Sequence, residues 1–336
     1  MEVKEFDYIL PENLIALEPA AQRDASRLLV LGKSGMEHRH FRDLPEYLEK
    51  GDMLLINDTR VMPVRLMGVK PTGGRLEVLL VKEISGKKWE ALSKGKYTGT
   101  IRISDELSLE LKEGREAVAL CDGDAKAAIF RAGQMPLPPY IRRQPNELDR
   151  ERYQTVYAGA EGSIAAPTAG LHFTEGLLGE IERKGVSIRK VTLHVGKGTF
   201  VPIKCEYLDG HRMEPERFEF HSGLFDEIKK TRANGGRVFA VGTTTTRALE
   251  GVLSGRCRIE NANGKVRGTT DVFIYPGFEF RGVDCLVTNF HLPRSTPLML
   301  ACAFSDKGRM LEAYAQAVSL GYRFFSYGDA MLILDR

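Results

Sequence analysis

Two histidines stand out because small and hydroxyl-bearing residues surround each of them. His172 lies near the end of a run, 162–174, that is rich in Gly, Ala, Ser and Thr. His194 lies in a second such run, 191–200, which contains two glycines and two threonines. Small residues let the backbone approach a ligand closely, and an imidazole can transfer protons near neutral pH. We therefore expect both histidines to be catalytic, although a structural role fits each one taken alone.

A polar run of four residues, Asn57-Asp58-Thr59-Arg60, directly follows the apolar segment 53–56. Short apolar segments are typical of buried strands, and substrates of α/β proteins commonly bind where such strands end. We interpret the run as part of a substrate cradle in which Asp58 orients or replaces a catalytic histidine. A capped turn with Arg60 paired to Asp58 would explain the same residues.

Two more polar loops are expected at the ends of strands. Four consecutive threonines, 243–246, precede Arg247 at the predicted start of a helix. Free N–H groups and hydroxyls at such a place favour an anion such as a carboxylate or phosphate. Asn289 and His291 follow another apolar segment, and we expect them to read the edge of a nucleobase.

Strands and helices that alternate along the chain must position these side chains. Strands are predicted at 27–31, 53–56, 237–241, 271–275, 285–288 and 330–334, and helices at 44–50, 175–184, 224–233, 248–253, 297–304 and 309–320. Such alternation is typical of an α/β layer or barrel.

The texture changes between residues 64 and 130, where short strand-like runs follow one another at close spacing, the last of them at 127–130. Runs of this kind indicate a small antiparallel sheet or barrel. We therefore predict an α/β fold in which a barrel-like mixed α/β catalytic domain, 1–62 plus 151–336, is interrupted by a smaller all-β domain, 63–150.

The segment that leads out of the inserted domain is basic. It contains arginines interleaved with tyrosines, a combination that suits phosphates and unstacked bases. The residues predicted to contact RNA are Arg142, Arg143, Arg150, Arg152 and Tyr153. A solvated linker balanced by its own carboxylates would explain the same composition.

The overall composition is that of an ordinary soluble protein. Of the 336 residues, 43% are hydrophobic and 28% charged, and no apolar run approaches the roughly 20 residues of a membrane span. The N-terminal segment lacks the hydrophobic stretch of a secretory signal, and the five cysteines are scattered singly, as reduced thiols are. We expect a cytoplasmic protein. Its formal net charge of +3 permits a nucleic-acid partner without requiring one.

Several common catalytic signatures do not occur in the sequence. The Gly196-Lys197-Gly198 stretch lacks the third glycine of a dinucleotide-binding loop and precedes a strand-like segment. The sequence also has no Gly-x-Ser-x-Gly elbow, no His-Glu-x-x-His motif and no carboxylate cluster for Mg²⁺. We therefore expect chemistry without a metal or another cofactor.

Seven motifs, in order along essentially the whole chain, carry a family resemblance. They lie at 57–61, 138–141, 152–158, 165–174, 192–200, 288–296 and 322–330. In these motifs the chain closely resembles the S-adenosylmethionine:tRNA ribosyltransferase-isomerases of queuosine biosynthesis. One position departs from the family pattern, because Glu214 stands where relatives often carry a second histidine after His211.

The resemblance implies that S-adenosylmethionine is a substrate. Its ribosyl group would be transferred to a 7-aminomethyl-7-deazaguanine at the wobble position of tRNA and isomerised, giving epoxyqueuosine with release of adenine and methionine. The partner would be the tRNA anticodon stem-loop, whose target base must be splayed out to reach the pocket. The resemblance also implies an α/β barrel-like domain interrupted by an all-β domain, and an enzyme that acts as a monomer without a metal.

This reaction needs a base near the ribose C5′, whose protons the sulfonium acidifies, and an acid to protonate the leaving adenine. We expect His172 or His194 to be the base and the other to be the acid, with Asp58 as an orienting or substitute group. Arg60 and the loop 243–247 would hold the methionine carboxylate. The predicted substrate contacts in full are Asn57, Thr59, Arg60, Thr168, Gly170, Gly196, Gly198, Thr199, Thr243, Thr244, Arg247, Asn289 and His291.

Two other functions fit parts of the sequence. A metal-free nucleosidase or glycosyl-transfer enzyme acting on small nucleosides would leave the inserted domain with a structural role only. A non-catalytic RNA-binding module would predict salt-sensitive tRNA binding and would have no need for the Gly/Thr loops.

Overall fold

The computed structural model describes residues 1–196, 203 and 205–335, which divide into two compact units. The larger unit comprises Met1–Thr59, Thr155–Ala160 and Pro167–Arg336, and the smaller unit comprises Arg60–Gln154 and Glu161–Ala166. The predicted insertion, 63–150, falls inside the smaller unit, which also includes a few residues on either side and the separate segment 161–166.

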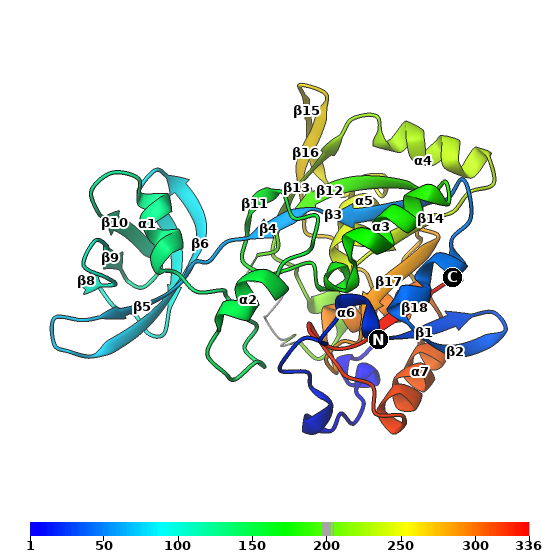
Figure 1. Ribbon diagram of the computed structural model, residues 1–336, viewed down its shortest axis with the longest axis horizontal. Coiled ribbons are helices and arrows are strands. Elements are labelled where there is room, and N and C mark those ends of the chain that lie inside the picture. Colours follow the sequence, from blue (N-terminus) through cyan, green and yellow to red (C-terminus); the bar gives the residue numbers. More distant parts are fainter. Residues whose placement is uncertain (197–202, 204, 336) are drawn as a thin grey trace. The chain divides into compact units, whose positions relative to one another are not determined.

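The larger unit is built on a ten-stranded mixed sheet (Figure 1). In spatial order its strands are β15 (Arg258–Ala262), β16 (Lys265–Thr270), β13 (Glu216–His221), β12 (Ser187–Leu193), β3 (Met53–Asn57), β14 (Val238–Val241), β17 (Cys285–Asn289), β18 (Ala330–Ile333), β1 (Arg27–Gly32) and β2 (Gly35–His40). The four central strands β12, β3, β14 and β17 run parallel to one another. The α/β class expected from the sequence is confirmed, and the described strands form an open sheet with β15 and β2 at its edges.

Helices connect these strands where the sequence supplies caps. The α-helices of the larger unit are α3 (Glu175–Arg183), α4 (Leu224–Ala233), α5 (Thr243–Leu253), α6 (Thr296–Phe304) and α7 (Lys307–Ser319), and the 3₁₀ turns are η1 (Val3–Phe6), η2 (Glu12–Leu14), η3 (Arg23–Ala25), η4 (Phe41–Tyr47), η5 (Thr168–His172) and η7 (Leu208–Gly210). Thr174 caps α3 by accepting from the backbone N–H of Leu177. Ser295 caps α6 in the same way, with Pro297 in its first turn.

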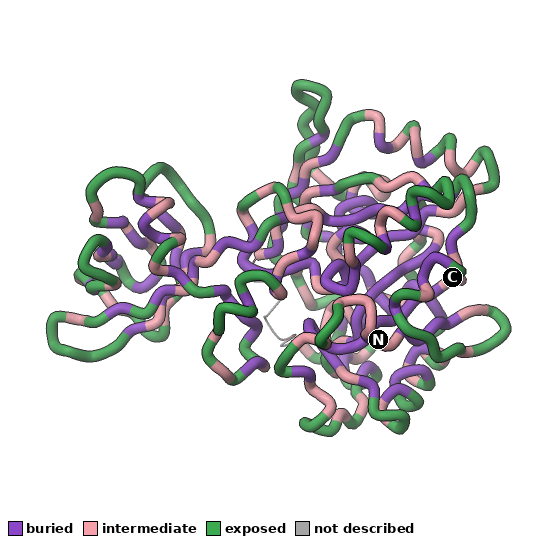
Figure 2. Tube along the Cα trace, viewed as in Figure 1, coloured by how far each residue is buried: buried purple, intermediate pink, exposed green. Residues whose placement is uncertain are grey.

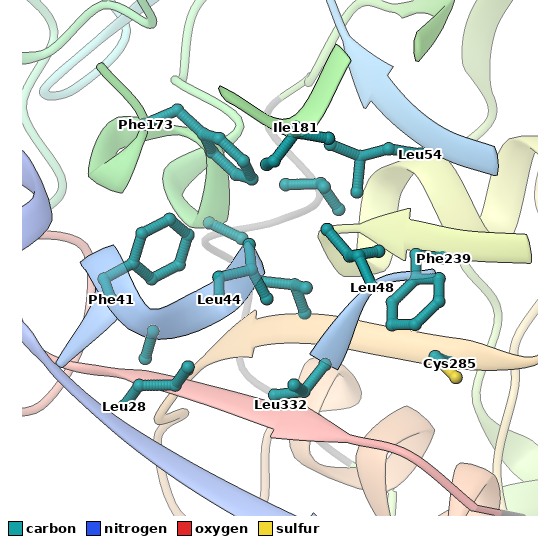
Figure 3. Packing of buried hydrophobic residues seen from close by; sticks show 14 of the residues in the cluster. Leu28, Phe41, Leu44, Leu48, Leu54, Phe173, Ile181, Phe239, Cys285 and Leu332 are labelled. Atoms are coloured by element: carbon teal, nitrogen blue, oxygen red, sulfur yellow. The ribbon is translucent and has the colours of Figure 1, made fainter. Parts of the chain in front are cut away.

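The core of the larger unit lies against the central strands. Every residue of β3, β14, β17 and β18 is buried (Figure 2). Leu54, Phe239 and Leu332 of these strands face Phe41 of η4 and Phe173, which follows η5 (Figure 3). Because apolar side chains cover these strands, their sequences are nearly continuous hydrophobic runs, and that pattern made them recognisable.

The smaller unit contains a closed six-stranded antiparallel barrel, which confirms the antiparallel barrel predicted for this part of the chain. Its strands follow the order β10 (Glu116–Leu120), β7 (Lys88–Ser93), β6 (Arg75–Ser85), β5 (Arg65–Val69), β8 (Gly99–Arg102) and β9 (Ser108–Lys112). Trp89, Ile101 and Leu109 fill its interior. Two helices, α1 (Ala125–Ala132) and α2 (Glu147–Arg152), accompany the barrel, and β4 (Thr59–Val61) pairs with β11 (Ala160–Ser163).

Three predicted elements were wrong in type. Residues 127–130 belong to helix α1, because Asp124 accepts hydrogen bonds from the first-turn amides of Lys126 and Ala127. Residues 271–275 form no strand, since β13 begins at Glu216, opposite Thr270, and offers no partner beyond it. The predicted helix at 44–50 is the 3₁₀ turn η4, which contains Pro45.

Candidate active site

The parallel direction of the central strands brings four of the predicted polar loops to one edge of the sheet. The loops that follow the carboxyl ends of β3, β12, β14 and β17 begin with Asp58, His194, Gly242 and Phe290, respectively. We call this the carboxyl edge. Antiparallel β13 starts there with Glu216. In open α/β sheets this edge is where ligands bind.

His194 reaches from the end of β12 to the turn that follows β3. Its Nδ1 atom is 2.9 Å from Oγ1 of Thr59, which donates to the carbonyl oxygen of Ala160 at 3.4 Å. Beside it, Oγ1 of Thr192 donates a 2.6 Å hydrogen bond to Oδ1 of Asp58. The structure thus brings His194, Thr59 and Asp58 together, although Asp58 binds Thr192 and not the imidazole.

Burial keeps the His194 imidazole neutral near pH 7. It lowers the pKa of His194 below the usual value of 6.5, and the positive charge of Arg217 lowers that pKa further, whereas Asp58 opposes both. When Nδ1 donates to Thr59, Nε2 keeps a lone pair, and within the described residues no hydrogen bond reaches that atom. A neutral imidazole with a free lone pair can act as a general base.

Asn57 joins this network to the start of α5. Its Oδ1 accepts hydrogen bonds from the amides of Thr59 and Leu193, both at 3.1 Å. Its Nδ2 donates to the carbonyl oxygen of Leu193 at 3.0 Å and lies 3.4 Å from Oγ1 of Thr244. Fully buried Asn57 therefore fixes the turn after β3 against β12, a positioning role for a residue predicted to touch substrate.

Arg247 in α5 is nearly buried, with 8% of its surface exposed. Its Nη1 donates to Oε2 of Glu216 at 2.5 Å, and its Nε donates to the carbonyl oxygen of Val272 at 3.1 Å. Its buried Nη2 has no hydrogen-bond partner among the described residues. Oε1 of Glu216 accepts from the amide of Gly196 at 3.3 Å, so the loop after β12 is bound to the same ion pair.

A small pocket of about 20 Å³ opens beside Arg247. Its lining consists of Met213, Thr243, Thr244, Arg247, Val272, Phe273, Ile274, Thr296, Pro297 and Leu300. The guanidinium and two of the hydroxyls come from α5, the hydroxyl of Thr296 comes from α6, and the other walls are apolar. Its lining offers donors to an anion, with apolar side chains beside them.

The segment in which a family histidine is replaced lies next to this pocket. Met213 lines it, and the ring of His211 packs edge-on against Phe273 with ring centres 4.9 Å apart. Glu214 is exposed. Burial and the neighbouring Arg212 lower the pKa of His211, which is therefore neutral near pH 7.

His172 has a different environment, because both of its ring nitrogens are hydrogen-bonded inside the protein. Its Nδ1 is 2.7 Å from Oγ of Ser26, its Nε2 is 3.0 Å from Nδ2 of Asn289, and its ring stacks on Phe41. The Asn289 amide donates to Nε2, so Nδ1 carries the proton and donates to Ser26. Burial, assisted by the charges of Arg323 and Arg23, lowers the pKa of His172 to about 3.

Asn289 and His291 also bond within the fold. Nδ2 of Asn289 lies 3.2 Å from the carbonyl oxygen of Phe325, whereas its Oδ1 is buried without a partner in the described structure. Nε2 of His291 is 2.8 Å from Oγ1 of Thr288, and burial lowers the pKa of His291 to about 3. Of these atoms, Oδ1 of Asn289 is the acceptor left for another donor.

Tight packing around position 170 leaves no room for a side chain, which explains the glycine there. A Cβ atom at this position would lie 2.1 Å from the hydroxyl oxygen of Tyr157 and 2.8 Å from Cγ2 of Thr155. The Tyr157 hydroxyl is buried without a hydrogen-bond partner in the described structure. Burial raises the pKa of Tyr157, and the charge of Asp58 raises it further. Thr168 starts the same 3₁₀ turn and is half-buried.

The predicted RNA contacts lie in the smaller unit, as does Arg60. Arg142 and Arg150 are exposed, but Arg143 makes a two-pronged ion pair with the buried Asp149, at 2.6 and 2.8 Å. Tyr153 is fully buried, so its ring packs inside and does not face solvent. The remaining exposed or half-buried residues of this set are Arg60, Arg142, Arg150 and Arg152.

Gly198 and Thr199 lie outside the described residues. Within the described ranges, no group of three or more His, Cys, Asp or Glu is arranged to hold a metal ion. The same ranges contain no helix that is both long and apolar enough to cross a membrane.

Sequence reasoning missed Glu216, Ser26 and the contact role of Thr192. Glu216 lies in an ordinary strand pattern, and only the pairing of β13 with β12 places it beside Arg247. Ser26 precedes an apolar strand by one residue and carries no motif. Apolar and polar residues alternate in 191–195, which places Thr192 on the same face as His194, and this alternation is the sequence signal for Thr192.

Comparison with known proteins gives a consistent match. The model of a family described as "Queuosine biosynthesis protein" matches residues 3–333. The S-adenosylmethionine:tRNA ribosyltransferase-isomerase of Thermodesulfovibrio yellowstonii is 51% identical, and the alignment covers 99% of this chain and 100% of that protein. The enzyme of the same name from Staphylococcus saprophyticus is 47% identical over 99% and 100%. The crystal structure of an S-adenosylmethionine tRNA ribosyltransferase from Thermotoga maritima is 37% identical, with a TM-score of 0.57, covering 98% of this chain and 100% of that one.

Proposed function

Because this chain belongs to the family of queuosine biosynthesis proteins, we infer that it is an S-adenosylmethionine:tRNA ribosyltransferase-isomerase. It transfers the ribosyl group of S-adenosylmethionine to 7-aminomethyl-7-deazaguanine at the wobble position of tRNA and isomerises it, releasing adenine and methionine and leaving epoxyqueuosine. The observation that carries this conclusion is that relatives with this name match almost the full length of both chains at about half identity.

The pocket beside Arg247 is the proposed site for the methionine part of S-adenosylmethionine. The unpartnered Nη2 of Arg247 and the amides at the start of α5 would bind the carboxylate. Met213 and Phe273 would contact the thioether chain. Binding there would give a partner to a buried donor that has none among the described residues, which is a favourable exchange.

His194 is the proposed base, and the free lone pair at Nε2 supports this choice. It would remove a proton from the ribose C5′, and the adjacent sulfonium would stabilise the resulting carbanion. The proton taken up by His194 is then available for the adenine that leaves, so one imidazole can serve in both steps. His172 fits a positioning role better, because protonation at Nε2 would break its hydrogen bond with Asn289.

The remaining features of the reaction are also proposals. We propose that the anticodon stem-loop is the bound part of tRNA, that the enzyme works as a monomer in the cytoplasm, and that it needs neither a metal nor another cofactor. Turnover that is unchanged in the presence of EDTA, and a monomeric mass in solution during turnover, would support these points. Loss of activity with EDTA that added metal restores would refute the metal-free reaction.

Incubation with precursor-bearing tRNA and S-adenosylmethionine tests the function directly. Mass analysis of the digested tRNA should show epoxyqueuosine, with adenine and methionine released in equal amounts. Release of adenine from S-adenosylmethionine without tRNA would instead indicate a nucleosidase. Binding of tRNA with no product would indicate an RNA-binding module.

A further inference from the structure

The barrel of the smaller unit has two ends that differ in charge. Neighbouring strands run antiparallel, so alternate loops lie at the same end. The loops 70–74, 94–98 and 113–115 form one end, which we call the basic end. The amide of Gly114 donates to the carbonyl oxygen of Tyr97 at 2.8 Å, and Nζ of Lys70 lies 4.6 Å from the centre of the Tyr97 ring. Three loops distant in sequence therefore meet there.

Six cations gather at or next to the basic end, namely Lys70, Arg75, Lys94, Lys96, Lys112 and Arg115. In the described structure none of the six forms an ion pair, and all except the half-buried Lys70 are exposed. Two carboxylates accompany them, and one of these, Glu116, is already paired with Lys88 at 3.0 Å. The basic end thus carries positive charge that the fold does not neutralise.

The opposite end, formed by loops 86–87, 103–107 and 121–124, is acidic. It contains Asp105, Glu106, Asp122 and Asp124. The cations near it are engaged, because Arg102 lies 3.5 Å from Asp105, Arg131 lies 3.1 Å from Glu106, and Lys87 donates to the carbonyl oxygen of Cys121 at 2.8 Å. The barrel is therefore polarised along its length, an arrangement that a uniformly solvated surface does not need.

The two units also differ in net charge. The smaller unit holds 18 Lys and Arg against 14 Asp and Glu, whereas the larger unit holds 30 against 31. The excess positive charge of the protein therefore lies in the unit that carries the basic end. Unneutralised cations of this kind attract polyanions over a distance of about 10 Å at ordinary salt.

We propose that the basic end of the barrel binds the phosphate backbone of the tRNA substrate, an inference that rests on the proposed function. Phosphates fit this surface because its polar side chains are almost all donors and its turns contain Gly73, Gly95 and Gly114, which keep the loops low. The Tyr97 ring lies against Lys70 and is half-buried, so base stacking is not its role. The basic end therefore contributes affinity and orientation, and the choice of base is made elsewhere.

Charge reversal in the loop 94–98 tests this proposal. The dissociation constant for tRNA is measured for Lys94→Glu/Lys96→Glu at about 50 and about 200 mM salt, and should rise about tenfold or more at the lower salt. The slope of log affinity against log salt should fall by about 1 to 2, because two phosphate contacts are lost. The KM for S-adenosylmethionine should not change.

A matched control is Lys229→Glu/Lys230→Glu on α4, which changes the same charge at two exposed lysines of the larger unit. It should alter tRNA affinity by less than about twofold to threefold, as a long-range effect does. A second pair at the basic end, Arg75→Glu/Arg115→Glu, should repeat the loss seen with the lysines. Lys94→Arg/Lys96→Arg, which keeps the charge, should bind like the parent protein.

The outcomes separate this inference from the proposed function. If the parent protein makes epoxyqueuosine, and both basic-end pairs bind tRNA as tightly as the α4 control, the basic end is not the tRNA surface and the enzyme assignment stands. If the parent protein makes no epoxyqueuosine, the proposed function fails, whatever the binding results.

Discussion

Two regions at the carboxyl edge of the same sheet each contain a histidine, yet their hydrogen bonding is opposite. Around His172, both ring nitrogens are hydrogen-bonded in a buried site, one to Ser26 and the other to Nδ2 of Asn289. Around His194 and Arg247, one imidazole nitrogen and one guanidinium nitrogen are left without partners in the described structure. We call these the closed region and the open region.

The difference teaches that residue type and loop composition do not separate a structural histidine from a reactive one. Both lie in Gly- and Thr-rich runs, and both have lowered pKa values because they are buried. What differs is whether the fold already uses both ring nitrogens. Donors and acceptors that the fold leaves unused are the ones available to a substrate.

The largest expected effect comes from substitutions of the two histidines. His194→Gln should lower kcat/KM for adenine release in the presence of tRNA by about 10²- to 10⁴-fold, the usual contribution of a general base. His172→Gln should lower it by less than about tenfold, provided the protein is folded. For the parent protein, kcat/KM should decline only below pH 6.5, since protonation of His194 occurs below that value.

Equal losses in both variants would remove the distinction between the regions. A large loss in His172→Gln with near-normal turnover in His194→Gln would reverse it. Adenine release can be followed by chromatography, and folding by circular dichroism of the same samples.

The second effect concerns the ion pair of the open region. Arg247→Met should raise the KM for S-adenosylmethionine by about 10- to 100-fold, as expected for the loss of a charged hydrogen bond. It should also destabilise the fold by about 3–5 kcal/mol, because it removes the cationic partner of the buried Glu216 carboxylate. Arg247→Met/Glu216→Gln should recover much of the stability in urea unfolding but not the KM. Recovery of both would mean that Arg247 has only a structural role.

A third effect probes the tight packing beside Asp58. Gly170→Ala should destabilise the protein by about 1–3 kcal/mol, since the added methyl group overlaps the Tyr157 hydroxyl. Combining it with Tyr157→Phe should reduce that loss in thermal unfolding, because the nearest atom is removed. Tyr157→Phe alone breaks no described hydrogen bond and serves as the control. Additive losses in the double variant would show that the clash lies elsewhere.

A fourth effect is the pH dependence of stability that the closed region produces. The pKa of His172 is about 3 in the folded protein and about 6.5 when unfolded, so the unfolded state takes up the proton first as pH falls. Stability from this residue is complete above pH 6.5 and declines by about 1.4 kcal/mol per pH unit below it, towards pH 3. Urea unfolding at several pH values should show a shallower decline for His172→Gln. An identical pH slope would mean that His172 is not buried as a neutral group.

Local patterns predicted much of this molecule. The apolar runs of β3, β14, β17 and β18, and the close spacing of the short strands in the barrel, each depend on a few neighbouring residues, so the sequence alone was sufficient. The loop 243–247 and the turn 57–60 were also recognisable as polar loops at strand ends.

Contacts between residues that are far apart in the sequence could not be predicted. Glu216 meets Arg247, and Ser26 meets His172, only through the order of the strands, and neither partner is marked by its own surroundings in the sequence. The same limit explains why His172 and His194 looked equivalent. Strand-like composition at 127–130 was misleading because a single capping residue, Asp124, decided the helix.

The place of β18 in the sheet has a consequence for synthesis on the ribosome. β18 lies between β17 and β1 in the sheet. Residues 28–31 of β1 therefore have no parallel partner until residues 330–333 of β18 have been synthesised. The barrel strands, in contrast, pair mostly with near neighbours in sequence and emerge together. The barrel is thus able to fold while translation continues, whereas the nascent larger sheet keeps an unpaired gap until its last strand leaves the exit tunnel.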